Sequence, residues 1–268
     1  MCLTPIRLKN PTYRGRIGEY FYNTLPCGHC AECLSMRIED WIIRLKEELR
    51  VSKYSIFLTL TYNEDNLPIG NLPSKKDVQL FHRYLRRKGI KFKYFIVSEN
   101  GEQFNRIHYH GIYFITAYYE NLYHILASTW NKGYIFLGEA NGKTIRYVTK
   151  YILKDFGGTK DNFYLMSKNL GHNYIERMLN WHRADLLERN YYPEGKFKKH
   201  LPRYYRNKIY TDNEKSLINY HKDLHVSSQI DCTSSGEFYN QLQNELEKQR
   251  RWDKKISDHK NKKKSIKL

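Results

Sequence analysis

The sequence has no long apolar run and comparatively few acidic residues, and these absences narrow what the protein can be. No stretch approaches 18 consecutive apolar residues and the mean hydropathy is −0.76, which excludes a transmembrane helix and a membrane partner. The first residues lack the apolar core of a secretory signal, so we expect a cytosolic protein. Asp and Glu number 28 against 46 Lys and Arg, a formal net charge of +18. This balance disfavours a metabolic enzyme for small neutral substrates and favours a polyanionic partner.

Internal repeats are also absent, and cysteine is scarce except at one place. A chain of 268 residues buries a core without needing disulfides. Four of its five cysteines lie within the first 33 residues, and in a reducing compartment such clustering indicates a metal rather than disulfides. The chain has 24 tyrosines, which among so many basic residues suit a surface that stacks bases and binds phosphates.

Apolar periodicity and turn residues predict an α+β fold with an antiparallel sheet. Helices are expected over 34–49, 75–88 (with Ser74 as N-cap and Gly89 at the end), 121–130 and 143–155, and strands over 55–62, 93–98, 107–115 and 134–137. Strands 93–98 and 107–115 are expected to form a hairpin with a longer loop around Asn100-Gly101. Residues beyond about 160 are expected to be mainly helical, with a basic tail at the end.

His108 and His110 are the first candidate site. They are separated by one residue in the expected strand 107–115, so both imidazoles point to the same face and could bind one divalent cation. Two unrelated histidines are the simpler interpretation. Glu99, in the preceding strand, could complete a His₂–carboxylate set that leaves room for a phosphate oxygen.

The expected helix 143–155 presents the second candidate site. At about 100° per residue, one face carries the polar residues Tyr147, Lys150, Tyr151 and Lys154. The opposite face carries the apolar residues Ile145, Val148 and Ile152. Tyrosines in helices are often core or rim residues, but here the apolar stripe exists without them. We therefore interpret this face as catalytic, with tyrosine attacking a DNA phosphate and ammonium groups favouring the phenolate.

The cysteine cluster is the third candidate site. Cys27, Cys30 and Cys33 form C-x₂-C-x₂-C, and either Cys2 or His29 could supply a fourth ligand. Structural zinc is favoured over an iron–sulfur cluster or free thiols. A basic patch, Arg83, Arg86, Arg87 and Lys88, is a further candidate for binding phosphates, although such a face is often only solvated.

These motifs, taken in order, resemble the replication initiators of microviruses, especially the gokushovirus branch of the HUH endonucleases. The matching segments are Cys2 with 26–33 (PCGHCAEC), 58–62 (LTLTY), 98–101 (SENG) with 106–110 (RIHYH), and Trp130, Gly133 and Gly138 leading into 147–151 (YVTKY). They cover a little over half of the chain. Ile107 stands where a proline usually precedes the triplet, and SENG stands where the family has GEYG.

The resemblance implies a nicking enzyme for rolling-circle replication of a small single-stranded DNA phage, acting in the cytoplasm of the bacterial host. Tyr147 and Tyr151 would be the nucleophiles, yielding a 5′-phosphotyrosine and a free 3′-hydroxyl. His108 and His110, with Glu99 as third ligand, would bind Mg²⁺ or Mn²⁺. Origin DNA, single- and double-stranded, would be the partner, with a host helicase and replication proteins as further candidates.

On this interpretation the chain divides into four parts. They are a Cys-rich, zinc-binding segment with an amphipathic helix (1–50), an HUH nicking domain built on a central antiparallel sheet flanked by helices (51–160), a mainly helical accessory region (161–247) and a basic tail (248–268). Two alternatives stay open: an HUH plasmid initiator or transposase, and a non-catalytic zinc-bearing nucleic-acid-binding protein whose tyrosines only stack on bases.

Overall fold

A computed structural model of the chain describes residues 2, 4–9, 22–101, 106–152, 162–219, 221, 247, 250, 251 and 254. The chain forms two compact units, one made of Met1–Arg37 with Asp212–Leu268 and the other of Ile38–Thr211. Within the described ranges, no helix has both the length and the apolar character needed to span a membrane.

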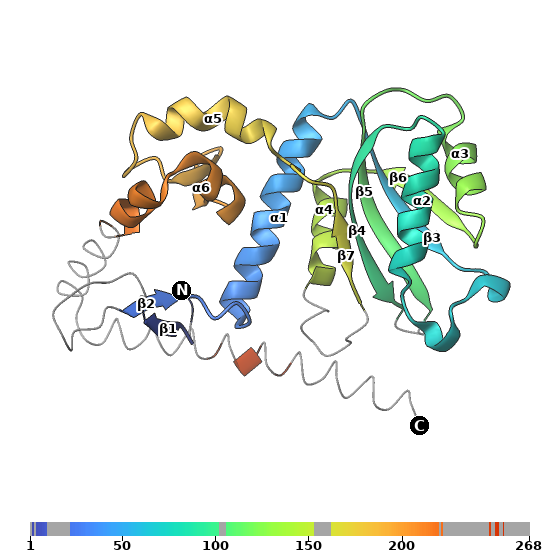
Figure 1. Ribbon diagram of the computed structural model, residues 1–268, viewed down its shortest axis with the longest axis horizontal. Helices are drawn as coiled ribbons and strands as arrows, with labels where there is room; N and C mark the ends of the chain where they lie inside the picture. The colour runs from blue at the N-terminus through green and yellow to red at the C-terminus, as the bar shows by residue number, and fades with distance from the viewer. Residues whose placement is uncertain are drawn as a thin grey trace. The chain divides into compact units, whose positions relative to one another are not determined.

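Helices and short strands alternate along the chain (Figure 1). The elements are β1 (Ile6–Lys9), β2 (Tyr22–Leu25), α1 (Ala31–Val51), β3 (Tyr54–Thr61), the short 3₁₀ helices η1 (Glu64–Asn66) and η2 (Ile69–Asn71), α2 (Lys75–Arg87), β4 (Phe92–Asn100), β5 (Ile107–Ile115), α3 (Leu122–Thr129), β6 (Ile135–Glu139), α4 (Gly142–Thr149), β7 (Tyr164–Met166), α5 (Asn173–Arg183), β8 (Tyr191–Glu194), β9 (Phe197–His200) and α6 (Arg203–Ile209).

The centre of the larger unit is a five-stranded sheet in the order β6-β3-β5-β4-β7. All neighbouring strands are antiparallel. β4 and β5 form the expected hairpin, in which the Gly101 amide donates to the Arg106 carbonyl at 2.7 Å. The α+β prediction with a central antiparallel sheet flanked by helices is confirmed.

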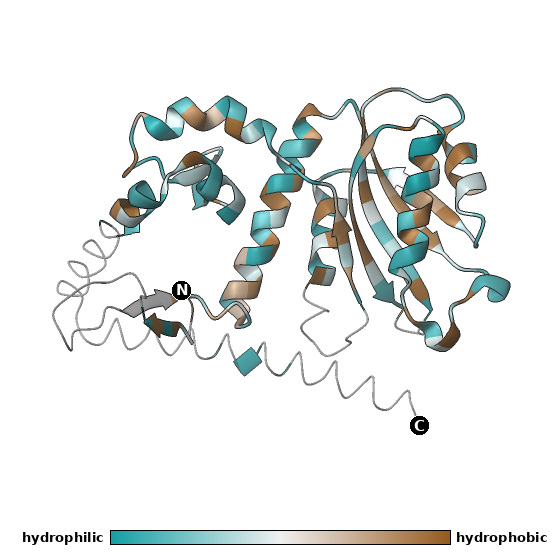
Figure 2. Cartoon of the chain, in the orientation of Figure 1, coloured by the Kyte–Doolittle hydropathy of each residue, from teal (hydrophilic) through white to brown (hydrophobic). Residues whose placement is uncertain are grey.

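One face of the sheet is covered by α2 and α3. Ser74 caps α2 by accepting a hydrogen bond from the Asp77 amide at 3.2 Å, as expected for an N-cap serine. The buried side chains of α2 are Val78, Phe81, His82 and Leu85. Figure 2 shows the rest of α2 as mainly hydrophilic, so the helix is amphipathic and its apolar stripe seals this face.

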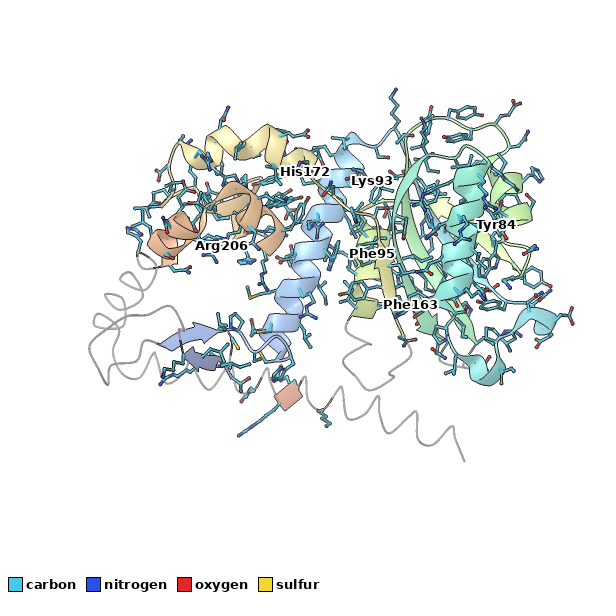
Figure 3. The ribbon with its side chains drawn as sticks, in the orientation of Figure 1. Tyr84, Lys93, Phe95, Phe163, His172 and Arg206 are labelled. Atoms are coloured by element: carbon cyan, nitrogen blue, oxygen red, sulfur yellow. The ribbon has the colours of Figure 1, made fainter. Side chains whose placement is uncertain are left out.

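The other face is covered by α4 and by the part of α1 that follows Arg37. Trp41 of α1 packs on Phe95 of β4, with ring centroids 4.9 Å apart. Lys93 on the same strand pairs with Glu48 of α1 at 2.8 Å, and Figure 3 labels Lys93 and Phe95 on the strand that faces this helix. α1 begins at Ala31, earlier than the expected Leu34, because the cysteine segment already forms its first turn.

The expectation of a mainly helical region after residue 160 is incomplete. α5 and α6 are present, but β7 adds a strand to the central sheet and β8 pairs with β9 in a separate hairpin. β8 contains Pro193, which argues against a strand in a local reading. Contacts with α1 stabilise it instead: Lys46 binds Glu194 at 2.7 Å and the Tyr192 hydroxyl donates to Glu47 at 2.7 Å. Such distant partners leave no local periodicity.

β1 and β2 are a second departure from the expected elements, since their segment is punctuated by glycine and proline. In the tail predicted over 248–268, only residues 250, 251 and 254 are described. The four-part division of the chain stays a prediction.

Candidate active site and candidate metal centre

Two rows of side chains cross the sheet on the face covered by α1 and α4. In one row His108 lies opposite Glu99 on β4 and Thr61 on β3, and in the next His110 lies opposite Thr59 on β3. Directly opposed residues of antiparallel strands face the same side. The register therefore brings Glu99 beside the histidine pair, a question that the sequence left open.

The two histidines use their Nδ1 atoms to hold their rings. His108 Nδ1 lies 2.9 Å from the Arg106 carbonyl oxygen, so this nitrogen carries the proton and Nε2 is left with a lone pair. His110 Nδ1 lies 3.0 Å from the Thr59 hydroxyl, while its Nε2 lies 3.0 Å from a Glu99 carboxylate oxygen. The outer partners on Nδ1 follow the pattern in which metal-binding histidines are oriented.

The donor types of this cluster suit a divalent ion, but the side chains are not drawn together around one point. The two imidazole rings are parallel, with centroids 6.0 Å apart, the spacing imposed by the strand. Among the described residues, a set of three or more candidate ligands within 4.8 Å occurs only at the cysteines. Gly101 leaves room for the His108 ring, because a Cβ there would lie 3.1 Å from His108 Cε1.

Tyr147 and Tyr151 from α4 and the turn after it pack against His110. The Tyr147 ring centroid lies 5.3 Å from that of His110 at an angle of 79°, and the Tyr151 centroid lies 5.7 Å away in a stacked arrangement. The two tyrosine rings are 5.2 Å apart. Lys150 places its ammonium 4.3 Å and 4.8 Å from their centroids. The residue types expected to act together thus share one site.

The two tyrosines differ in exposure, contrary to the expectation that both lie opposite the apolar stripe. Tyr147 is 37% exposed, whereas Tyr151 is 4% exposed and belongs to the apolar cluster with Ile145 and Val148. α4 ends at Thr149 and residues 150–152 form a 3₁₀ turn, which advances about 120° per residue and rotates Tyr151 inward. Lys154 lies outside the described residues.

The local electrostatics also differ from the expectation for Tyr151. Burial raises the pKa of its phenol well above the ordinary value, and hydrogen bonds to Tyr147 and Glu99 raise it further. The Lys150 ammonium lies over the rings rather than lowering this pKa. Burial and the neighbouring His110 lower the pKa of His108, which favours its neutral, ligand-competent form.

A pocket of about 250 Å³ opens beside His108. It is lined by Thr61, Tyr62, Asn63, Glu64, Arg106, His108 and Tyr134. Arg106 is held there by an ion pair with Glu64 and by a hydrogen bond to the Tyr62 carbonyl at 2.9 Å. The sequence assigned no role to Arg106 or Tyr134. The signal that could have found them is strand register, which requires the sheet order.

The four cysteines of the smaller unit form the candidate metal centre, Cys2, Cys27, Cys30 and Cys33. Two Sγ–Sγ distances are 3.8 Å and 3.9 Å, for Cys2–Cys30 and Cys27–Cys33 respectively. A tetrahedron with Zn–S bonds of about 2.3 Å has edges of about 3.8 Å, so the donor set fits one zinc ion. His29 is exposed and does not belong to the group.

The thiols of this centre differ in acidity. Burial opposes ionisation of Cys27, but hydrogen bonds from Thr4 and from the His29 and Cys30 amides lower its pKa to about 5. Burial raises the pKa of Cys33 to about 12, and the neighbouring sulfurs add to the rise. One thiolate is thus available before a metal binds, and a cation would be needed to ionise the rest.

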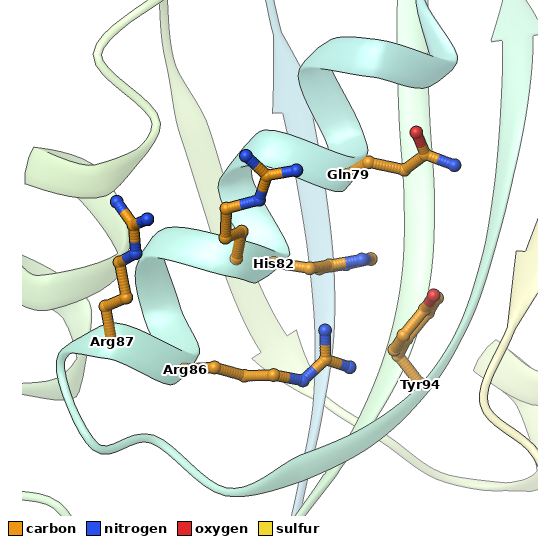
Figure 4. A pocket seen from close by; sticks show the side chains of 6 residues that line it. Gln79, His82, Arg86, Arg87 and Tyr94 are labelled. Carbon is orange, nitrogen blue, oxygen red and sulfur yellow. The ribbon is translucent and has the colours of Figure 1, made fainter.

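A second pocket, of about 460 Å³, lies on the opposite face of the sheet against α2. Its lining residues are Gln79, His82, Arg83, Arg86, Arg87 and Tyr94, and Figure 4 shows several of them around the His82 ring. Within the described part of the chain, none of the three guanidinium groups makes an ion pair, and His82 Nδ1 has no hydrogen-bond partner. The basic patch expected from the sequence therefore surrounds a real pocket.

Similarity to known proteins covers the part of the chain that carries the histidine and tyrosine motifs. Residues 55–156 match the family of Replication-associated protein ORF2. Replication-associated protein ORF4 of Chlamydia phage 1 is 30% identical over 52% of this chain and 40% of its own length. Replication-associated protein ORF2 of Spiroplasma virus 4 is 26% identical over 59% of each chain. These matches confirm the resemblance to microviral replication proteins.

The match to a third relative extends further along the chain. Replication-associated protein VP4 of Bdellovibrio phage phiMH2K is 24% identical over 76% of this chain and 73% of its own length. The chain thus spans 40% and 59% of the first two relatives named above. No solved structure gives a significant match.

Proposed function

We propose that the protein is a DNA-nicking initiator of rolling-circle replication. The observation that carries the proposal is the packing of Tyr147 and Tyr151 on His110, on the sheet face that also presents His108 and Glu99. A candidate nucleophile, an imidazole pair and a carboxylate then meet at one place. Similarity to replication-associated proteins of small phages supports a role in replication itself.

The reaction would be a transesterification at one phosphate of the origin. A tyrosine oxygen attacks phosphorus, the bond from phosphorus to the 3′ oxygen breaks, and the 3′ oxygen leaves as a hydroxyl. The phenol proton passes to a base, and Glu99 is the carboxylate to which the Tyr151 hydroxyl is already hydrogen-bonded. The other tyrosine can repeat the reaction, so that one residue keeps a DNA end while its neighbour cuts.

His108, His110 and Glu99 would bind Mg²⁺ or Mn²⁺ through two imidazole nitrogens and one oxygen. When bound, the ion supplies a Lewis acid that polarises the scissile phosphate. Nε2 of His108 and Nε2 of His110 are the atoms that remain for this role, since both Nδ1 atoms have other partners. Lys150 would contribute positive charge near the phosphate, and Lys154 is proposed for the same role from the sequence alone.

The cysteine centre is proposed to hold a structural zinc ion that ties the segment around Cys2 to the start of α1. The partners proposed for the whole protein are origin DNA in single- and double-stranded form, a host helicase and other replication proteins, in the cytoplasm of a bacterial host. The net charge of +18 supports the DNA partner, because basic side chains can bind its phosphates.

Covalent capture tests the nicking activity. Protein is incubated with single-stranded and supercoiled DNA carrying the cognate origin, with Mn²⁺ or with EDTA, and an SDS-resistant protein–DNA band is measured. We expect a metal-dependent band that disappears in His108→Ala and in the double variant Tyr147→Phe/Tyr151→Phe. Tyr118→Phe is the matched control, because Tyr118 is 71% exposed and outside the site. Binding of origin DNA without any band would favour the non-catalytic alternative.

The zinc proposal has a separate test. Metal content of purified protein is measured for the wild type and for Cys30→Ser, together with the change in melting temperature on chelation. We expect one tightly bound zinc ion per chain and its loss in the variant, since one sulfur of a tetrahedral set is removed. Full metal content in Cys30→Ser would contradict the proposed ligand set.

A further inference from the structure

The edge strand β6 exposes two large aromatic side chains. Phe136 is 60% exposed, and Tyr134, the residue before the strand, is 75% exposed. β6 has a neighbour on one side only, β3, to which the Tyr134 carbonyl also accepts a hydrogen bond from the Thr61 amide at 2.9 Å. Phenylalanine at the surface of a small domain is unfavourable unless another molecule covers it.

The register places these aromatics in the same two rows as the histidine pair. Phe136 lies opposite Thr59, which lies opposite His110. Tyr134 stands two residues earlier, beside Thr61, which lies opposite His108. Because opposed residues share a face and residues two apart share a side, both aromatics stand on the same face as the histidines.

Direct contacts continue the row toward the tyrosines. The Phe57 ring lies 6.4 Å from Phe136 and 6.0 Å from Tyr147, edge to face in both cases. Phe57 is also stacked on His110, 5.8 Å away. The exposed aromatics are therefore the outer end of a continuous aromatic layer whose inner end is the candidate active site.

The surroundings fit a polyanion that carries flat groups. Tyr134 forms one wall of the pocket of about 250 Å³, whose other walls include His108 and Arg106. The guanidinium of Arg106 and the ammonium of Lys150 bring positive charge to the two ends of the layer. An aromatic surface flanked by cations is what unpaired nucleotides require, since bases stack while the phosphates face the charges.

We propose that Tyr134 and Phe136 form a stacking platform for two unpaired nucleotides of the DNA strand that is cut, next to the scissile phosphate. The proposal rests on the nicking function proposed above and names the state of its substrate. Two residues apart on one strand are about 7 Å apart, roughly twice the 3.4 Å rise per nucleotide of a DNA duplex. The platform therefore suits a stretched single strand and not the closed stack of a duplex.

The test uses Tyr147→Phe/Tyr151→Phe as background, which keeps both rings but prevents covalent capture. Affinity for a fluorescein-labelled single strand and for its duplex is measured by anisotropy after adding Tyr134→Ala or Phe136→Ala. We expect each alanine to weaken single-strand binding by about 5- to 100-fold and duplex binding by less than about twofold. Tyr134→Phe and Phe136→Tyr should restore affinity, because either ring stacks. Tyr118→Ala, which removes an exposed tyrosine elsewhere, should have no effect.

Single-strand affinity unchanged in both alanine variants would overturn the proposal. An equal loss on duplex and single strand would also overturn it, since the platform would then not distinguish the two. If β6 instead pairs with a second copy of the chain, the alanine variants would change the mass in solution and leave the affinity unchanged. Failure of covalent capture by the wild type would refute the nicking function alone, because the binding measurement does not depend on it.

Discussion

The two faces of the central sheet carry the same residue types, tyrosine and histidine, but in different settings. On the face covered by α2, the Tyr62 hydroxyl donates to Asp77 at 2.8 Å and the Tyr109 hydroxyl accepts from the Ser74 amide at 2.8 Å. His82 shares a 2.8 Å hydrogen bond with the Tyr113 hydroxyl. All four aromatic side chains are almost fully buried, so this arrangement stabilises the fold.

On the opposite face, the same groups stand at an opening. Tyr147 is partly exposed, Lys150 is exposed, and the Glu99 carboxylate lies against His110. A buried phenol with a neutral partner is fixed, whereas a phenol beside a carboxylate and a cation can change its proton and its bonding partner. The comparison teaches that the residue types do not define the site. The neighbouring charges and the access to solvent do.

The largest expected effect is on catalysis, and it should be confined to one face. Tyr147→Phe/Tyr151→Phe should lower the rate of covalent adduct formation by more than about 1,000-fold, because no nucleophilic oxygen remains. Its melting temperature should stay close to that of the wild type. Thermal melts and adduct yield on the same preparations check both statements, and adduct formation by the double variant would refute the assignment of the nucleophiles.

The next effect is the pH dependence of stability from the other face. Burial, and then the charge of Arg86, lower the pKa of His82 to about 3 from an ordinary value of 6.5. Between these values the unfolded chain binds a proton that the folded chain excludes, so stability falls as the pH drops below about 6.5. At pH 5 the loss is about 2 kcal/mol.

Urea unfolding at pH 7 and pH 5 measures this loss. In His82→Gln the difference between the two pH values should shrink by about 2 kcal/mol. In His124→Gln, which removes an exposed histidine of α3, it should persist. Tyr94, Tyr113 and the arginines Arg83 and Arg86 are the groups that face His82, and they stay in place in both variants. An unchanged difference in His82→Gln would show that another group titrates.

A smaller effect is expected for the matched phenol on the buried face. Tyr109→Phe removes the acceptor of the Ser74 amide and a 3.1 Å hydrogen bond with the Tyr62 hydroxyl. The unfolding free energy should fall by about 1–2 kcal/mol, because a donor loses its partner. Adduct formation at a temperature where the variant is folded should stay at the wild-type rate. Absence of adduct from the folded variant would contradict the distinction between the two faces.

The smallest effect concerns the pocket against α2. Replacing Arg83, Arg86 and Arg87 by alanine should weaken binding to DNA of any sequence. The slope of log K against log salt on a duplex should become shallower by about 0.9 for each phosphate that is no longer neutralised. The adduct rate at saturating DNA should not change. Lys53→Ala, an exposed lysine elsewhere, serves as control. An unchanged salt slope would show that these arginines only complement the dipole at the end of α2.

Several features of the fold could be predicted because their causes are local. The alternation along β5, the turn residues Asn100 and Gly101 and the cap at Ser74 predicted a hairpin and a helix that the structure confirms. The short strands β7 and β8 could not be predicted, since distant partners stabilise them. The same holds for the site. The spacing of His108 and His110 indicated a shared face, but the approach of Glu99 depended on register.

The sequence by itself determined which chemical groups the protein can use. Periodicity placed a pair of imidazoles on one side of a strand and two phenols one helical turn apart, because these repeats follow from backbone geometry alone. Only the tertiary structure decided that α4 covers the histidine face, that a 3₁₀ turn buries Tyr151 while Tyr147 stays partly exposed, and that Phe136 lies in the same row as His110. Those outcomes depend on which strands are neighbours and on how helices pack over them, and no local pattern encodes that information.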